Sequence, residues 1–163
     1  MSKTALVFAG QGGQFVGMGK DLYDKYPECR AVFEQADVVL GQKISQICFE
    51  GPDEMLTRSD FCQPAIFTVS VACYKALIAQ YGRAPEVCGM AGLSLGEWTA
   101  LHVAGAVTFE DTLRILSARG RFMQEACEEN PGAMVSVIGL SREKLEEICA
   151  SAGVYMANIN SPE

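Results

Sequence analysis

Residues 86–104, EVCGMAGLSLGEWTALHVA, contain the sharpest structural signal in the chain. The first part is an apolar run that predicts a buried strand over residues 86–93, and the second part has a helical pattern over residues 95–104. Gly-Leu-Ser-Leu-Gly at the junction matches G-x-S-x-G, in which small flanking residues let the chain turn sharply between a strand and a helix. We therefore predict a nucleophile elbow with Ser94 at its tip.

The surroundings of Ser94 decide whether it can react. The N–H of Leu95, at the positive end of the following helix, is placed to donate to an oxyanion. A serine hydroxyl also needs a base, and His102 is the only histidine. Because eight residues separate it from Ser94, the helical rise alone puts it about 12 Å away. His102 is therefore not the base, and either the base lies beyond residue 163 or this chain is not a competent catalyst.

A glycine-rich loop follows the first apolar run. Residues 4–8 predict a short buried strand, and Gly10-Gln11-Gly12-Gly13-Gln14 comes directly after it. The loop lacks the lysine of a P-loop and the spacing of a dinucleotide fingerprint, so phosphate binding is not supported. In a parallel sheet this loop lies beside the elbow, where Gln11 can position a substrate carbonyl.

Arg119 lies on the apolar face of a predicted helix over residues 108–129, which Thr108 opens with Asp111 in the form of a capping box. An inward guanidinium needs an anionic partner, and its planar fork suits a carboxylate. Two partners stay open at this point: an internal Asp or Glu, or an anionic ligand.

The composition excludes several classes of protein. The chain has 163 residues, of which 49% are hydrophobic and 20% charged, enough for one folded domain and against disorder. A net charge of −7 without a dense basic run argues against a nucleic-acid partner. We find neither a signal peptide nor a stretch that approaches a membrane span, and expect a cytoplasmic protein without a membrane partner.

The cysteines give no sign of a disulfide framework or a metal site. They are odd in number, widely scattered and free of C-x-x-C pairs, and most sit among small apolar residues. We expect small buried hydrophobic side chains at Cys29, Cys48, Cys62, Cys73, Cys88, Cys127 and Cys149.

The rest of the sequence predicts several helices, followed by a boundary and a β-α-β unit. Helices are expected over residues 28–40, 53–58 and 64–81. A boundary is expected at Asn130-Pro131-Gly132, followed by a β-α-β unit with strands at 133–140 and 154–159 around a helix at 141–152. Such a unit cannot close a core alone, so we expect the natural protein to continue beyond residue 163.

Taken together, these stretches resemble the malonyl-CoA:acyl carrier protein transacylases. The resemblance runs through the whole chain in the family's order and spacing. It rests on FAGQGGQFVGMG (8–19), QPA (63–65), GLSLGEWTAL (92–101), RGRFMQ (119–124), GAM (132–134) and NSP (160–162).

The resemblance implies the following roles. Ser94 attacks the malonyl thioester of coenzyme A, and the phosphopantetheine thiol of acyl carrier protein then takes the acyl group. Arg119 matches the arginine that binds the malonyl carboxylate, and Gln11 matches the residue that shares the oxyanion site with the Leu95 N–H. Residues that match the lining of the substrate pocket are Gln63, Leu93 and Met123, with Leu93 standing where many members have histidine.

The resemblance also implies an α/β fold. Residues 1–130 would form the first part of an α/β-hydrolase-like parallel-sheet subdomain, and residues 131–163 the start of a ferredoxin-like small subdomain. The implied partners are malonyl-CoA and acyl carrier protein, with no cofactor and no metal. The family's catalytic histidine belongs to a C-terminal half that these 163 residues do not contain.

Two other functions fit the same motif. G-x-S-x-G occurs equally in thioesterases and other serine hydrolases, in which water is the acceptor. A chain without a base would also suit a non-catalytic protein that only binds carrier protein or coenzyme A.

Overall fold

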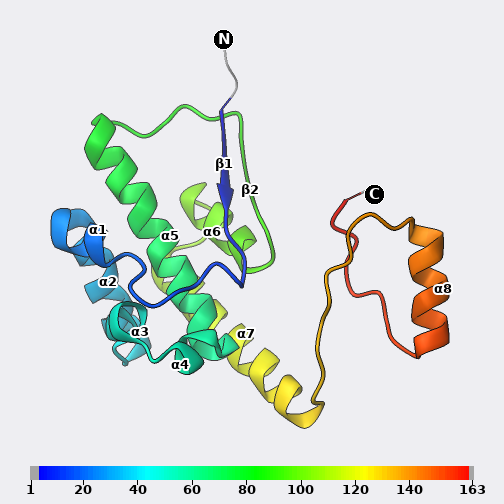
Figure 1. The fold of residues 1–163 in the computed structure, drawn as a ribbon. Helices are drawn as coiled ribbons and strands as arrows, with labels where there is room; N and C mark the ends of the chain where they lie inside the picture. The colour runs from blue at the N-terminus through cyan, green and yellow to red at the C-terminus, as the bar shows by residue number, and fades with distance from the viewer. Residues whose placement is uncertain (1–3, 162–163) are drawn as a thin grey trace. The chain divides into compact units, whose positions relative to one another are not determined.

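The computed structural model describes residues 4–161 (Figure 1). The chain divides into two compact units, Met1–Asn130 and Pro131–Glu163, and the division falls at the turn where the sequence places a boundary. In chain order the elements are β1 (Ala5–Phe8), α1 (Lys20–Lys25), α2 (Pro27–Leu40), α3 (Ile44–Glu50), α4 (Asp53–Thr57), α5 (Ser59–Tyr81), β2 (Gly89–Gly92), α6 (Leu95–Val103), α7 (Phe109–Glu129) and α8 (Arg142–Ala152).

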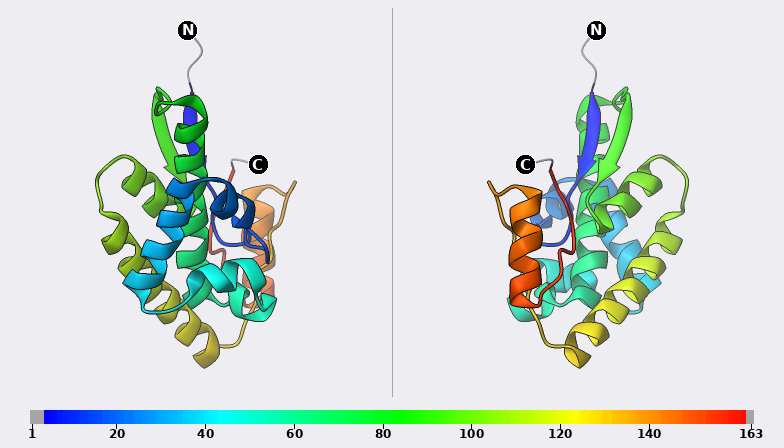
Figure 2. Two further views of the ribbon diagram at one scale, coloured as in Figure 1. Left: turned by 90° about the vertical axis from the view of Figure 1, so that its left-hand side faces the viewer. Right: turned by 90° about the vertical axis from the view of Figure 1, so that its right-hand side faces the viewer.

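The two strands form a small parallel sheet, and both views of Figure 2 show them side by side. The register pairs Ala5 with Gly89 and Phe8 with Gly92, so both strands end at the same edge. β2 is shorter than the strand predicted over residues 86–93, because β1 offers only four residues to pair with. The loops that follow the two strands therefore start next to each other, as expected for an α/β fold.

The helices of the first unit follow the sequence pattern closely. The helices predicted over residues 28–40, 53–58, 95–104 and 108–129 are confirmed as α2, α4, α6 and α7, with ends that move by no more than one residue. Thr108 Oγ1 accepts the Asp111 N–H at 3.1 Å, so the predicted cap of α7 is present. The sequence analysis missed the short helices α1 and α3.

α5 is the central helix of this unit and packs against α2 and α7 (Figure 1). It begins at Ser59, five residues before the predicted start, and carries Pro64 inside the helix. It is also long and apolar enough to cross a membrane, which corrects the expectation that no stretch approaches a span. Its buried side chains include Phe67 and Val71, and the polar Thr68, all covered by the rest of the unit. We therefore regard α5 as the core helix of this fold.

Burial separates the cysteines into groups. Cys29, Cys48 and Cys62 are buried, as expected. The expectation is wrong for the other four, because Cys73, Cys88 and Cys127 are exposed and Cys149 is half-buried. Burial raises the pKa of the Cys48 thiol to about 12 and that of Cys62 to about 11, with Asp37 adding to the effect at Cys48. Both thiols stay protonated at neutral pH and act as small apolar side chains.

The second unit contains α8 between two extended segments. The predicted helix is confirmed, and Ser141 caps it by accepting the Lys144 N–H at 3.4 Å. The two predicted strands, over residues 133–140 and 154–159, do not form. A strand needs a neighbour to satisfy its backbone, and within residues 131–161 the two segments make no ladder with each other. The β-α-β prediction is therefore wrong for this structure.

Candidate active site

Ser94 stands at a sharp turn between β2 and α6, as the elbow prediction requires. Its φ of 54° and ψ of −107° make it the only non-glycine residue with positive φ among residues 4–161. A Cβ added to Gly92 would lie 2.0 Å from the carbonyl carbon of Gly96, and one added to Gly96 would lie 2.5 Å from the Phe8 carbonyl oxygen. The two glycines thus leave room for the tight turn, and the backbone conformation of Ser94 itself costs about 1–3 kcal/mol.

The turn leaves one backbone donor beside the serine. The N–H groups of Gly96 and Glu97 donate to the carbonyls of Leu93 and Ser94, at 2.9 and 3.2 Å. The Leu95 N–H, at the first position of α6, has no acceptor among residues 4–161. This free donor at a helix N-terminus suits a developing negative charge.

The glycine-rich loop lies against the elbow. A Cβ on Gly10 would sit 2.8 Å from the Leu93 carbonyl oxygen, and the Leu93 N–H donates to the Phe8 carbonyl at 3.4 Å. The structure therefore brings the Gln11 loop and Ser94 to the same end of the sheet. The Gln11 side chain itself turns to α5, where Nε2 donates to Ser59 Oγ at 3.2 Å.

Arg119 reaches the serine from α7. Its Nη2 donates to Ser94 Oγ at 2.8 Å and its Nη1 donates to Gln63 Oε1 at 2.6 Å. The guanidinium is half-buried and makes no ion pair with a carboxylate in the described part of the chain. The sequence left an internal Asp or Glu and an anionic ligand open as partners of Arg119, and the structure shows no internal Asp or Glu in that place. A cation held by neutral groups beside a serine is suited to an anionic ligand.

Gln63 and Met123 complete the polar contacts around Arg119. Gln63 is fully buried on α5, and its Nε2 donates to Met123 Sδ at 3.1 Å. Because a guanidinium has only donors, it must meet the Gln63 carbonyl oxygen, which fixes the orientation of the amide. Met123, which contacts Gln63, is 39% exposed, and Leu93, directly before the serine, is 64% exposed, so both present apolar surface to solvent.

His102 is half-buried and packs against the core, away from the contacts of Ser94. Its Nδ1 lies 3.0 Å from the Val107 carbonyl oxygen, and its ring packs edge-on against Phe67 and Phe109. The prediction that it does not activate Ser94 therefore agrees with its contacts. Within residues 4–161 there is also no group of three or more His, Cys, Asp or Glu residues that could hold a metal ion.

The serine stands on an open surface and not in an enclosed pocket. Two hollows of about 660 and 780 Å³ flank the two strands, and neither is lined by Ser94, Arg119 or Gln63. The larger hollow borders β2 and α6, and the smaller lies between β1, α1 and α5. The polar groups of the candidate site therefore lie outside both hollows.

Sequence reasoning missed two polar residues near the site, Ser59 and Gln124. Ser59 begins α5 and accepts from Gln11, and Gln124 on α7 accepts the Ser59 backbone N–H at 3.1 Å. Gln124 lies within the RGRFMQ stretch, so the motif included it without indicating its contact. Nothing in the sequence singles out Ser59, because its role depends on a loop 48 residues away.

Comparison with known proteins gives consistent matches. The family model described as "Acyl transferase domain" matches residues 5–163. The chain is similar to a malonyl CoA-acyl carrier protein transacylase of Bacillus subtilis, at 40% identity over 99% of this chain and 52% of the relative.

Solved structures show the same likeness. An acyl carrier protein S-malonyltransferase from Vibrio cholerae matches with a TM-score of 0.83 and 38% identity, covering 93% of this chain and 49% of that one. A malonyl-transacylase in complex with a type II PKS acyl-carrier protein matches with a TM-score of 0.78 and 35% identity, covering 92% and 48%. The chain thus spans about half the length of the relatives it matches. Because the family model covers nearly all of these residues, the chain belongs to the acyl transferase domain family.

Proposed function

We propose that the protein moves a malonyl group from coenzyme A to the phosphopantetheine thiol of acyl carrier protein, in fatty acid biosynthesis, through an acyl-enzyme on Ser94. The observation that carries this proposal is the contact of 2.8 Å between Arg119 Nη2 and Ser94 Oγ, with no carboxylate of the described chain on the arginine. The names of the relatives, malonyl CoA-acyl carrier protein transacylases, support the choice of substrate and acceptor.

The chemistry proceeds in two exchanges at one carbonyl carbon. Ser94 Oγ attacks the thioester, the C–S bond breaks, and coenzyme A leaves as a thiol with the proton taken from the serine. The pantetheine thiol then attacks the serine ester, the C–O bond breaks, and the proton returns to Ser94. In each exchange a tetrahedral oxyanion forms, and the Leu95 N–H and Gln11 are the donors proposed for it.

Arg119 selects the acyl group in this proposal. The malonyl carboxylate carbon is the third carbon from the serine oxygen in the acyl-enzyme, within reach of a guanidinium that touches that oxygen. Gln63 holds the other arm of the guanidinium at 2.6 Å, so the fork is already aimed when substrate arrives. Leu93 and Met123 supply apolar contact beside it.

The proton acceptor is not among the groups around Ser94 described above. Arg119 has only donors, and the His102 ring packs against Phe67 and Phe109. The resemblance assigns the base to a histidine in the half of the relatives that this chain does not span, and we propose that source. We also propose that the elbow and parallel strands belong to an α/β-hydrolase-like subdomain. Residues 131–163 would begin a ferredoxin-like one only where further chain supplies the neighbouring strands that the two segments around α8 lack here.

The experiment is acylation of the full-length protein by malonyl-CoA, followed by intact mass. We expect a malonyl adduct that disappears in Ser94→Ala and is discharged by carrier protein bearing phosphopantetheine. Release of free malonate without transfer to that thiol would instead identify a hydrolase. An adduct that persists in Ser94→Ala contradicts the proposed nucleophile.

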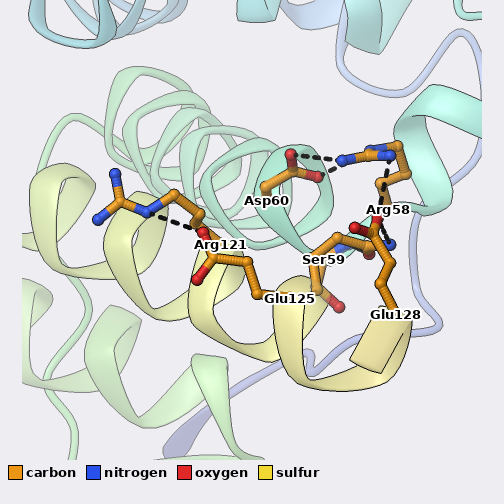
Figure 3. Close-up of polar contacts among 7 residues, drawn as sticks. Arg58, Ser59, Asp60, Arg121, Glu125 and Glu128 are labelled. Carbon is orange, nitrogen blue, oxygen red and sulfur yellow. Dashed lines mark hydrogen bonds and ion pairs between the residues drawn. The ribbon is translucent and has the colours of Figure 1, made fainter. Parts of the chain in front are cut away.

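Arg119→Ala tests the selector role. A hydrogen bond to a charged group contributes about 2 kcal/mol, so malonyl transfer should fall about 30-fold while transfer of an uncharged acyl group is kept or gained. Arg121→Ala is the matched control, because Arg121 lies two residues away, is exposed and pairs with Glu125 (Figure 3). Full malonyl transfer by Arg119→Ala overturns the carboxylate role.

A further inference from the structure

The backbones of α5 and α7 touch beside the candidate site. A Cβ added to Gly120 would lie 2.2 Å from the Ser59 carbonyl oxygen and 2.9 Å from the Asp60 Cα. Both of these atoms belong to the backbone, so no side chain can move aside to make room. The spacing of the two helices is therefore fixed at this point, next to Arg119 and one turn before Met123.

Arg119 and Met123 both contact one amide group of α5. Residues four apart lie on the same face of a helix, so these two side chains of α7 point toward the same neighbour. Gln63 Oε1 accepts a hydrogen bond from Arg119 Nη1 at 2.6 Å, and Gln63 Nε2 donates to Met123 Sδ at 3.1 Å. Both ends of the Gln63 amide therefore have a partner on α7.

The chemistry of these three groups permits one orientation of the amide. A guanidinium has only donors, so the carbonyl oxygen of Gln63 must face Arg119 and the amide nitrogen must face Met123. The thioether sulfur of methionine can accept a hydrogen bond, whereas an aliphatic side chain cannot. Because Gln63 is fully buried, bulk water does not reach the amide in place of the sulfur. Without the sulfur, the amide nitrogen would lose its acceptor, which is costly for a buried group.

The same arrangement holds a cation without neutralising it. The amide of Gln63 and the thioether of Met123 carry no net charge, and in the described part of the chain Arg119 makes no ion pair with a carboxylate. An Asp or Glu in either place would pair with the guanidinium and compete with a carboxylate of the ligand. The positive charge of Arg119 therefore stays available for an anionic ligand.

We propose that Met123 is a positioning residue, whose sulfur locks the Gln63 amide with its carbonyl toward Arg119 and so aims the guanidinium at the carboxylate of the acyl group. This inference rests on the proposed function for its catalytic meaning. It gives the Met123 sulfur a role in addition to apolar contact. The gain is preorganisation, because the guanidinium does not have to be ordered when the substrate arrives.

The orientation is tested first without any activity. In the full-length protein, the guanidinium N–H signals of Arg119 are identified by their loss in Arg119→Lys. Met123→Leu keeps an apolar side chain and removes the acceptor, so we expect the exchange of these hydrogens with water to become faster. In a Gln63→Leu background the same change should have no further effect. Unchanged exchange at Arg119 in Met123→Leu overturns the proposal.

Met55→Leu is the matched control for this substitution. Met55 has an exposed fraction of 37%, close to the 39% of Met123, and lies on α4 and not on α7. The exchange of the Arg119 hydrogens should therefore stay as in the unsubstituted protein. Equally fast exchange in Met55→Leu and Met123→Leu would mean a general loosening of the fold and would refute a specific role of the Met123 sulfur.

The catalytic meaning is tested by a double-mutant cycle on acyl transfer. Met123→Leu should lower kcat/KM for malonyl transfer about three- to tenfold, the worth of one hydrogen bond, while transfer of an uncharged acyl group is kept or gained. In a Gln63→Leu background the same change should have no further effect, because the amide on which the sulfur acts is gone.

Two results contradict the positioning role. An equal loss in both backgrounds, or for both acyl groups, means that Met123 acts by direct contact with the acyl chain and not through Gln63. If the unsubstituted protein transfers no malonyl group, the proposed function fails, whereas the exchange of the Arg119 hydrogens still decides whether Met123 acts through Gln63.

Discussion

The elbow at Ser94 and the segments on either side of α8 differ in the hydrogen-bond partners of their backbone. At the elbow, β2 pairs with β1 along its whole length and the following turn packs against backbone on both sides. In the second unit, apolar side chains face solvent, with Val135 84%, Ile138 90% and Tyr155 96% exposed. α8 forms there because a helix satisfies its own hydrogen bonds, whereas the flanking segments have no ladder to join. A helix can therefore form from local sequence, and a strand needs a partner.

The largest effect is expected where backbone packs on backbone. Gly92→Ala places a methyl group 2.0 Å from the Gly96 carbonyl carbon, with no flexible side chain to yield. We expect a loss of about 3 kcal/mol in the free energy of unfolding. Urea denaturation followed by circular dichroism measures it.

Gly89→Ala is the matched control in the same strand. Nothing lies within 4 Å of an added Cβ at Gly89, so its free energy of unfolding should change by no more than about 0.5 kcal/mol. Equal stabilities of the two variants would mean that the turn has room to relax, and would remove the steric basis of the elbow.

The helix caps compare the two units directly. Thr108 Oγ1 caps α7, which contributes Phe109, Leu113 and Leu116 to the core, whereas Ser141 caps α8, which has no buried residues. Thr108→Ala should lower the free energy of unfolding in the main transition by about 1–2 kcal/mol. Ser141→Ala should reduce the helical content of α8 and leave that transition unchanged, as measured by amide exchange. A shift of the main transition in Ser141→Ala would show that α8 unfolds together with the first unit.

The parts of the fold that could be predicted from the sequence are those that depend on local interactions. Helices α2, α6 and α7 could be predicted to within a residue, because helical periodicity, the glycine that ends α2 (Gly41) and the Thr108 cap of α7 are local features. The sequence also predicts strands over residues 133–140 and 154–159, which do not form. A β-favouring composition does not reveal whether a partner strand is present. The start of α5 was missed since Pro64 looks like a first-turn proline but lies inside the helix.

The candidate site divides in the same way. Ser94 follows from a motif with its own steric logic, and the inward face of Arg119 follows from helical periodicity. The partner of Arg119 did not follow: Gln63 and Ser94 meet it across 56 and 25 residues, distances that no local pattern spans. The contact of Ser59 with Gln11 could not be predicted either, because 48 residues separate the two.

The smallest effect concerns the pH response of α8. The pKa of the Glu143 carboxyl is lowered from its ordinary value of 4.5. The larger cause is a hydrogen bond from the Glu143 backbone N–H, and the next is a hydrogen bond with the Ser141 side chain. A carboxylate with a lowered pKa in the folded state stabilises that state above its ordinary pKa, and the contribution disappears as the pH falls through the lowered value. We therefore expect the first turn of α8 to loosen only below about pH 4.5, seen as faster amide exchange near Ser141. Glu143→Gln should remove this acid step, and Ser141→Ala should raise the pH at which it occurs. A step at the same pH in Ser141→Ala would assign the lowered pKa to the backbone bond alone, and a step that survives in Glu143→Gln would exclude Glu143 as its source.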